Sequence, residues 1–113
     1  MAKVRRYCGS YILEVDDNDI REYCGGKLYS IEGNKIREYC GPILYEIDGD
    51  RVREYCGSYI LEFDGDKVRR YCGGYICEID GDKIREYCGS YEYEIDGFIS
   101  HRMLMALITI LYA

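Results

Sequence analysis

The chain has 113 residues, enough for one small domain with one hydrophobic core. Its 21 acidic and 15 basic side chains give a net charge of −6, which argues against nucleic acid as a partner and disfavours adhesion to anionic lipid. The opening MAKVRRYCGS is charged and has no apolar run, so we expect no signal peptide. We therefore expect a cytoplasmic protein whose seven cysteines are reduced thiols.

A sixteen-residue unit recurs six times along the chain. The units start at Val4, Ile20, Ile36, Val52, Val68 and Ile84. Numbered from one to sixteen, each unit has Val or Ile at position one, Arg at position two and Tyr-Cys-Gly at positions four to six. The unit is too short for a pair of helices, and its β-branched and aromatic residues favour strands.

Two turn signals divide each unit into two short antiparallel strands. Gly after Cys, in CGSY, CGGY and CGPI, predicts a two-residue type II′ loop, and Asp-Gly in IDGD and FDGD predicts a type I′ loop. With these turns, position one pairs with position twelve of its own unit, and position ten pairs with position one of the next. Each unit then adds a stagger of two residues, which over about twelve strands closes a barrel of roughly 10 Å radius.

The last segment, from Met103 to Ala113, is apolar all round and predicts an enclosed helix. It is too short for a bilayer, which needs about 20 residues, but a helix about 10–12 Å across fits the predicted lumen. Gly97 would end the last strand and Ser100 would cap the helix. We expect one mainly β domain over residues 1–113, with six hairpins over residues 4–99 and a C-terminal helix over residues 100–113. The residues that plug the lumen would be Leu104, Leu107, Ile108 and Leu111.

Strand alternation predicts which positions face the lumen. We expect positions one, three, five, eight, ten and twelve inside, and positions two, four, nine and eleven outside. Arg at position two and Glu at position eleven would form an outer lattice, for example Arg53 with Glu62 and Arg69 with Glu78. Position three, which is Glu or Arg, fits the lumen poorly; His101 and Arg102 at the helix start are the candidates to meet its carboxylates.

Repeated hairpins of the type I-Y-x-I-D-G-x-x-V, such as LYEIDGDRV at 44–52, with a hydrophobic C-terminal segment, resemble the β-flower families. These are small, mostly bacterial or phage-borne proteins that are similar in architecture to the tubby C-terminal domain, a barrel around a hydrophobic helix. The resemblance covers Val4 to Ala113, and its Asp-Gly hairpin motif occurs in many β proteins. Tubby-like domains imply phosphoinositide or membrane tethering. The sequence has no basic lipid pocket, so we carry over the fold and not the ligand.

Cysteine at position five has two interpretations. We favour packing of a small residue beneath Tyr over a ring of thiols at one rim. Copies two strands apart lie roughly 9–10 Å from each other, beyond disulfide reach, so we expect free thiols. Cys77 replaces Leu or Tyr at position ten and is predicted to lie in the core. The six cysteines at position five are Cys8, Cys24, Cys40, Cys56, Cys72 and Cys88.

Tyr at position four predicts an outer belt of six aromatic rings. It either covers the sheet by cross-strand packing or forms an interaction surface for a protein partner or for self-association. The belt consists of Tyr7, Tyr23, Tyr39, Tyr55, Tyr71 and Tyr87. At the opposite rim the Asp-Gly turns gather carboxylates, which we interpret as solvated turn residues because a calcium site needs six to eight oxygens around one point.

One His and no Ser/His/Asp or Cys/His arrangement lead us to expect no enzyme, no catalytic residue, no metal and no cofactor. The sequence favours a non-catalytic cytosolic binding or scaffold module whose partner is unknown. One alternative is a tubby-like module that tethers to membrane lipid, which the charge does not favour. Another is capture of a small ligand or cation at a barrel rim.

Overall fold

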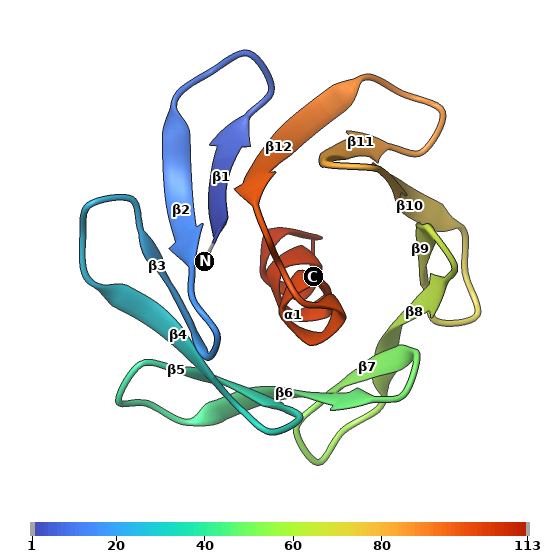
Figure 1. The fold of residues 1–113 in the computed structure, drawn as a ribbon. Coiled ribbons are helices and arrows are strands. Elements are labelled where there is room, and N and C mark those ends of the chain that lie inside the picture. Colours follow the sequence, from blue (N-terminus) through green and yellow to red (C-terminus); the bar gives the residue numbers. More distant parts are fainter. Residues whose placement is uncertain (1, 113) are drawn as a thin grey trace.

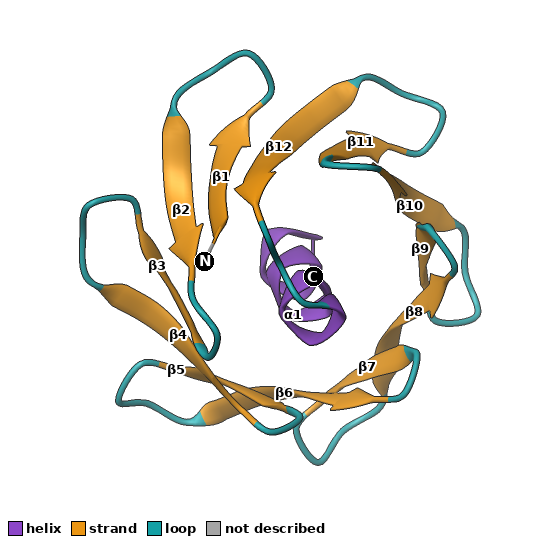
Figure 2. Ribbon diagram, viewed as in Figure 1, coloured by secondary structure: helices purple, strands orange, loops and turns teal. Residues whose placement is uncertain are grey.

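The computed structural model describes residues 2–112 and is a closed antiparallel barrel around an α-helix (Figure 1; Figure 2). The strands are β1 (Ala2–Arg6), β2 (Tyr11–Val15), β3 (Asp19–Glu22), β4 (Lys27–Glu32), β5 (Lys35–Glu38), β6 (Ile43–Asp48), β7 (Arg51–Glu54), β8 (Tyr59–Asp64), β9 (Lys67–Arg70), β10 (Tyr75–Asp80), β11 (Lys83–Glu86) and β12 (Tyr91–Gly97), and the helix is α1 (His101–Tyr112). The predicted mainly β barrel with an enclosed C-terminal helix is therefore confirmed. The two ends of the predicted domain, Met1 and Ala113, lie outside the described residues.

Each strand pairs with its neighbours in the sequence, and β1 closes the barrel by pairing with β12, Val4 opposite Ile95. The molecule is a disk with extents of 36, 35 and 17 Å. Loops after the odd-numbered strands up to β11 lie on its outer circumference, whereas turns after the even-numbered strands up to β10 lie nearer to α1 (Figure 1). We call these two edges the Tyr-Cys-Gly rim and the Asp-Gly rim after the residues of their loops.

Both hairpin registers differ from the predicted ones. Position one pairs with position ten of its own unit, as in Val52 opposite Leu61, and position twelve pairs with position one of the next unit, as in Ile47 opposite Val52. The two predicted partners are thus exchanged. The stagger keeps its size of two residues per unit but has the opposite sense, so the barrel still closes.

The register predicted for the hairpins at the Tyr-Cys-Gly rim is wrong because the turn there begins earlier than predicted. The Gly57 N–H donates to the carbonyl oxygen of Glu54 at 2.9 Å, which places Tyr55 and Cys56 at the centre of the turn. Cys56 adopts the positive φ of 57°, and Gly57 does not have a positive φ. A Cβ on Gly57 would lie 3.0 Å from the Cβ of Glu54, so this glycine is needed for close approach.

The Asp-Gly turn also begins one residue away from its predicted place. Asp48 pairs with Arg51, so the two central residues are Gly49 and Asp50. Gly49 has a φ of 61° and Asp50 has no positive φ, a combination typical of type II′ and not of the predicted type I′. In the first unit Asp17 takes the place of this glycine, and there the Asp16 N–H donates to the carbonyl oxygen of Asp19 at 2.9 Å.

A β-bulge changes which side chains face the lumen. Val52 lies opposite Leu61 and Arg53 opposite Tyr59, so Ile60 is an extra residue on β8. Positions one, ten and twelve line the lumen as predicted, but position eight turns outward, and Ile60 at position nine packs against the core. Positions three and five lie exposed at the Tyr-Cys-Gly rim, contrary to prediction, which removes the difficulty of placing charges in the lumen.

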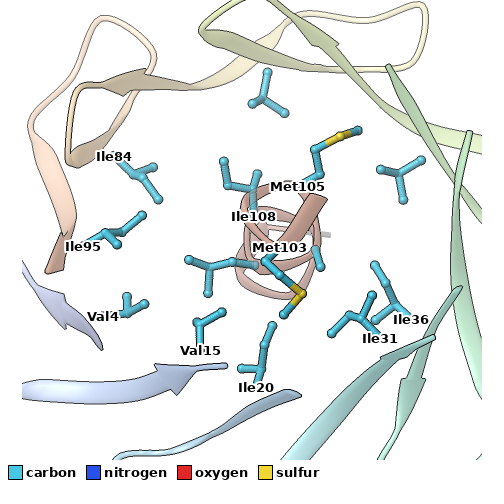
Figure 3. Packing of buried hydrophobic residues seen from close by; sticks show 14 of the residues in the cluster. Val4, Val15, Ile20, Ile31, Ile36, Ile84, Ile95, Met103, Met105 and Ile108 are labelled. Atoms are coloured by element: carbon cyan, nitrogen blue, oxygen red, sulfur yellow. The ribbon is translucent and has the colours of Figure 1, made fainter. Parts of the chain in front are cut away.

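Helix α1 fills the lumen, as its apolar sequence predicts. Ser100 caps it: its hydroxyl oxygen accepts from the Met103 N–H at 3.3 Å. Leu107 and Ile108 are fully buried, whereas Leu104 and Leu111, also predicted to plug the lumen, are half-buried. Figure 3 shows Met103, Met105 and Ile108 surrounded by wall residues that include Val4, Val15, Ile20, Ile31, Ile36, Ile84 and Ile95.

Side chains near the two ends of α1 bind opposite rims of the barrel. Arg102 donates to the carbonyl oxygens of Gly33 and Asp17 at 3.0 and 3.1 Å, both in Asp-Gly rim turns. The Tyr112 hydroxyl donates to the carboxylate of Glu92 near the Tyr-Cys-Gly rim, and burial together with this hydrogen bond raises the pKa of Tyr112. The predicted contact of the helix start with position-three carboxylates is wrong, because α1 begins at the other rim.

Two adjacent glycines test the account of the Tyr-Cys-Gly turn. A Cβ on Gly25 would lie 2.9 Å from the Cβ of Glu22, whereas a Cβ on Gly26 would meet no described atom within 4 Å. We expect Gly25→Ala to lower the free energy of unfolding by about 1–3 kcal/mol, because the strand or the turn must shift. Gly26→Ala should leave it unchanged or raise it by up to about 1 kcal/mol. Urea unfolding followed by circular dichroism measures both, and equal losses would contradict the turn geometry.

Candidate interaction surface

The six tyrosines of the predicted belt all lie exposed at the Tyr-Cys-Gly rim. Their exposed fractions run from 38% to 51%. Each is held by its backbone: the N–H of Tyr55, for example, donates to the carbonyl oxygen of Leu44 in the preceding hairpin at 3.0 Å. The belt is therefore a fixed feature of the wall, with large rings presented to solvent at each hairpin.

Tyrosines at position eight, predicted to face the lumen, instead extend the belt on the outer face. Four ring pairs join a position-four tyrosine to a position-eight tyrosine, with centroids between 4.9 and 5.2 Å apart. The pairs are Tyr7 with Tyr91, Tyr11 with Tyr23, Tyr59 with Tyr71, and Tyr75 with Tyr87. In the second and third units Lys27 and Ile43 occupy position eight, and the Lys27 ammonium lies 5.6 Å from the ring centroid of Tyr39.

Hydrogen bonds to aspartate fix the position-eight rings. The Tyr59 hydroxyl donates to the carboxylate of Asp48 at 2.6 Å, and the Tyr91 hydroxyl donates to that of Asp80 at 2.7 Å. This hydrogen bond raises the pKa of Tyr59 above its ordinary value, since the aspartate binds the protonated phenol. The same bond from Tyr11 to Asp96 crosses the closure of the barrel at 2.6 Å.

An Arg–Glu lattice covers the outer wall beside the belt, but with partners other than those predicted. Arg53 donates to Glu46 at 2.6 and 2.9 Å, not to Glu62, because the exchanged register brings arginine at position two opposite position eleven of the preceding unit. Arg69 donates to Glu62 in the same way, and Arg51 adds a bond of 3.1 Å. These bonds from Arg69 and Arg51 lower the pKa of Glu62. Exposed pairs of this kind contribute little stability individually.

A groove of about 500 Å³ lies beside the Asp-Gly turns that follow β6 and β8. Its lining consists of Asp48, Asp50, Arg51, Glu62, Phe63, Asp64 and Arg69. Several of these charges are already paired with one another, as in Arg69 with Glu62. Among residues 2–112, no group of three or more His, Cys, Asp or Glu side chains is placed to hold a metal ion.

The position-five cysteines are exposed, so the predicted packing beneath Tyr is wrong and the thiol ring is the observed arrangement. The reason is the turn: position five is its third residue, where the side chain leaves the sheet. Cys77 is buried in the core as predicted, and burial raises the pKa of its thiol to about 12. All seven cysteines are free thiols.

Comparison with known proteins gives no relative: no family model, curated protein or solved structure matches the chain. Within residues 2–112, α1 is not long or apolar enough to cross a membrane. The function is therefore inferred from the chemistry of the surface itself.

Alkylation separates the two classes of thiol. Native protein treated with excess N-ethylmaleimide at pH 7.5 should gain six adducts quickly, because the position-five thiols are exposed. The seventh adduct, on Cys77, should appear only after unfolding in guanidinium chloride. Intact-mass spectrometry with peptide mapping makes the measurement. Rapid modification of Cys77 in the native protein would contradict its place in the core.

Proposed function

We propose that the chain is a non-catalytic binding or scaffold module of the cytoplasm, and that the tyrosine belt is the surface with which it binds protein partners. The observation that carries this proposal is the exposure of all six position-four rings, between 38% and 51%, around one edge of the disk. Tyr and Arg are enriched where proteins bind one another, and a half-exposed ring offers a large contact area with few rotatable bonds. Seven free thiols are typical of a reducing compartment.

The fixed geometry of the belt favours binding. Four of the six belt rings already pack against a position-eight ring, and that ring is itself held by aspartate, as Tyr59 is by Asp48. These pairs therefore lose little conformational freedom when a partner covers them. The Arg–Glu pairs next to them keep the surrounding surface polar and mutually satisfied, as in Arg53 with Glu46. A polar border around aromatic contacts is the arrangement common in reversible protein interfaces.

Repetition of the surface suggests how such a module would act. The belt presents a similar aromatic contact at each of six hairpins, so one molecule could engage a partner with repeated segments or hold several partner molecules. Linked contacts of this kind raise the overall affinity well above that of a single one. A scaffold role follows from this multivalency. The barrel around a C-terminal helix also supports the resemblance to the β-flower families.

Two other functions have weaker support. Membrane tethering through α1 would require the helix to leave a barrel that encloses Leu107 and Ile108 and to break the hydrogen bonds of Arg102. Small-ligand capture is supported by the outer groove, whose volume of about 500 Å³ is within the usual range for ligand sites. Its lining, however, is mostly charged and internally paired, unlike the apolar lining typical of such sites.

The belt proposal is tested with the full chain as immobilised bait in reducing buffer. The belt variant carries Tyr55→Ser, Tyr71→Ser and Tyr87→Ser. The matched control carries three exposed position-three changes on the same rim, Glu22→Gln, Glu54→Gln and Glu86→Gln. Circular dichroism melting first establishes that both variants fold.

Proteins retained from a cytoplasmic lysate are then quantified by mass spectrometry. We expect a set of proteins that the wild type and the control retain equally and that the belt variant retains at least about tenfold less, since hot-spot truncation costs more than 1.4 kcal/mol. Retention of the same set by the belt variant would reject the belt as the binding surface.

A further inference from the structure

The six exposed cysteines adopt a backbone conformation that ordinarily selects other residues. Each has a φ of 56° or 57°, in the left-handed region where Gly, and after it Asn, is the usual choice. A residue kept in a sparsely populated conformation points to a role for its side chain. The fold itself does not need a thiol here, because the side chain is exposed at the rim.

Comparison among the six units of this chain supports the same conclusion. The neighbouring positions vary: position three is Glu or Arg, position seven is Ser, Gly or Pro, and position eight is Tyr, Lys or Ile. Position five is Cys in all six. The adjacent glycine is explained by its close approach to position three, as in Gly57 with Glu54, and in four of the six units the adjacent tyrosine by ring pairing. The exposed cysteine side chain has no comparable packing explanation in any of the six units.

The arrangement of the ring directs its chemistry outward. The six loops are spread around the circumference of a disk of 36 by 35 Å, so the cysteines of neighbouring loops lie beyond the span of a disulfide. Disulfides therefore cannot form between thiols of the same ring. Because the loops that carry them occupy the outermost circumference, two disks that approach edge to edge bring their Tyr-Cys-Gly rims together first (Figure 1).

We propose that the cysteine ring is a multivalent cross-linking site that joins further copies of this chain through intermolecular disulfides when a low-molecular-weight disulfide is present as oxidant. A ring thiolate attacks the small disulfide, forms a mixed disulfide and releases one small thiol. A ring thiolate of a second copy then attacks the protein sulfur of that mixed disulfide, forming the protein–protein bond and releasing a second small thiol. Two protein thiols are oxidised, one small disulfide is reduced, and the two thiol protons end on the two small thiols.

Six equivalent sites per disk mean that growth does not stop at a dimer. A reductant reverses the same exchange, so the assembly exists only under oxidising conditions. The cross-linking uses the cysteines and not the tyrosine belt, and its failure would leave the proposed function untouched.

The test uses the full-length protein, reduced, desalted and incubated with oxidised glutathione at pH 8. A ringless variant has Gly at all six position-five sites and retains Cys77. A single-thiol variant, named for its one ring thiol, restores Cys56 and also retains Cys77. Glycine accepts the φ of 57°, so both variants should fold; a parallel set with Asn at these sites provides a second check. Products are followed by non-reducing electrophoresis and light scattering.

We expect the wild type to form oligomers larger than dimers that dithiothreitol dissolves, the single-thiol variant to stop at the dimer, and the ringless variant to remain monomeric. A wild type that stays monomeric, whether its thiols carry glutathione or remain free, would overturn the proposal. So would a ringless variant that cross-links as the wild type does.

Discussion

The width of the barrel is the constraint on which the rest of the structure depends. Twelve staggered strands enclose a lumen that side chains of the wall alone do not fill. Helix α1 supplies the missing volume: its 12 residues span about 18 Å, matching the 17 Å thickness of the disk. In turn, a helix this apolar is stable only when it is enclosed, so the wall and α1 each bury a surface that the other needs.

The demands of the lumen also produce the outer surface. Position one must face α1, as Val52 does with no exposed area, and the turn at Glu54–Gly57 and the bulge at Ile60 set the register of the hairpin around it. Once the register is fixed, arginine at position two meets the preceding glutamate and tyrosine at position eight meets the preceding aspartate, as in Arg53 with Glu46 and Tyr59 with Asp48. The binding surface and the thiol ring are thus repeated because the core is repeated, which is why any function they carry is multivalent.

Much of the fold could be predicted from the sequence because it depends on features that recur in all six units. Strand number follows from two turn signals per unit, and closure depends on the total stagger, which an exchange of the two hairpin registers leaves unchanged in size. The enclosed helix follows from an apolar segment too short for a bilayer.

The positions of the turns and the orientation of several side chains could not be predicted, because they depend on local backbone geometry. The same letter serves two purposes in one unit: Gly49 provides a positive φ, whereas Gly57 makes room for the Cβ of Glu54. No residue type predicts the bulge at Ile60, yet that bulge turns Tyr59 outward. Cysteine is not a residue expected in the left-handed region, so the position of Cys56 at the centre of a turn, and its exposure, could not be predicted.

The central claim, that wall and helix fold only together, is tested most directly by a thermal melt of a chain that ends at Gly97. Circular dichroism at 215 nm would follow this truncated wall beside the full-length protein. We expect a cooperative transition for the full chain and none for the truncated one, because the empty lumen would expose the apolar inner face to water. A cooperative melt of the truncated wall, at a temperature close to that of the full chain, would contradict it.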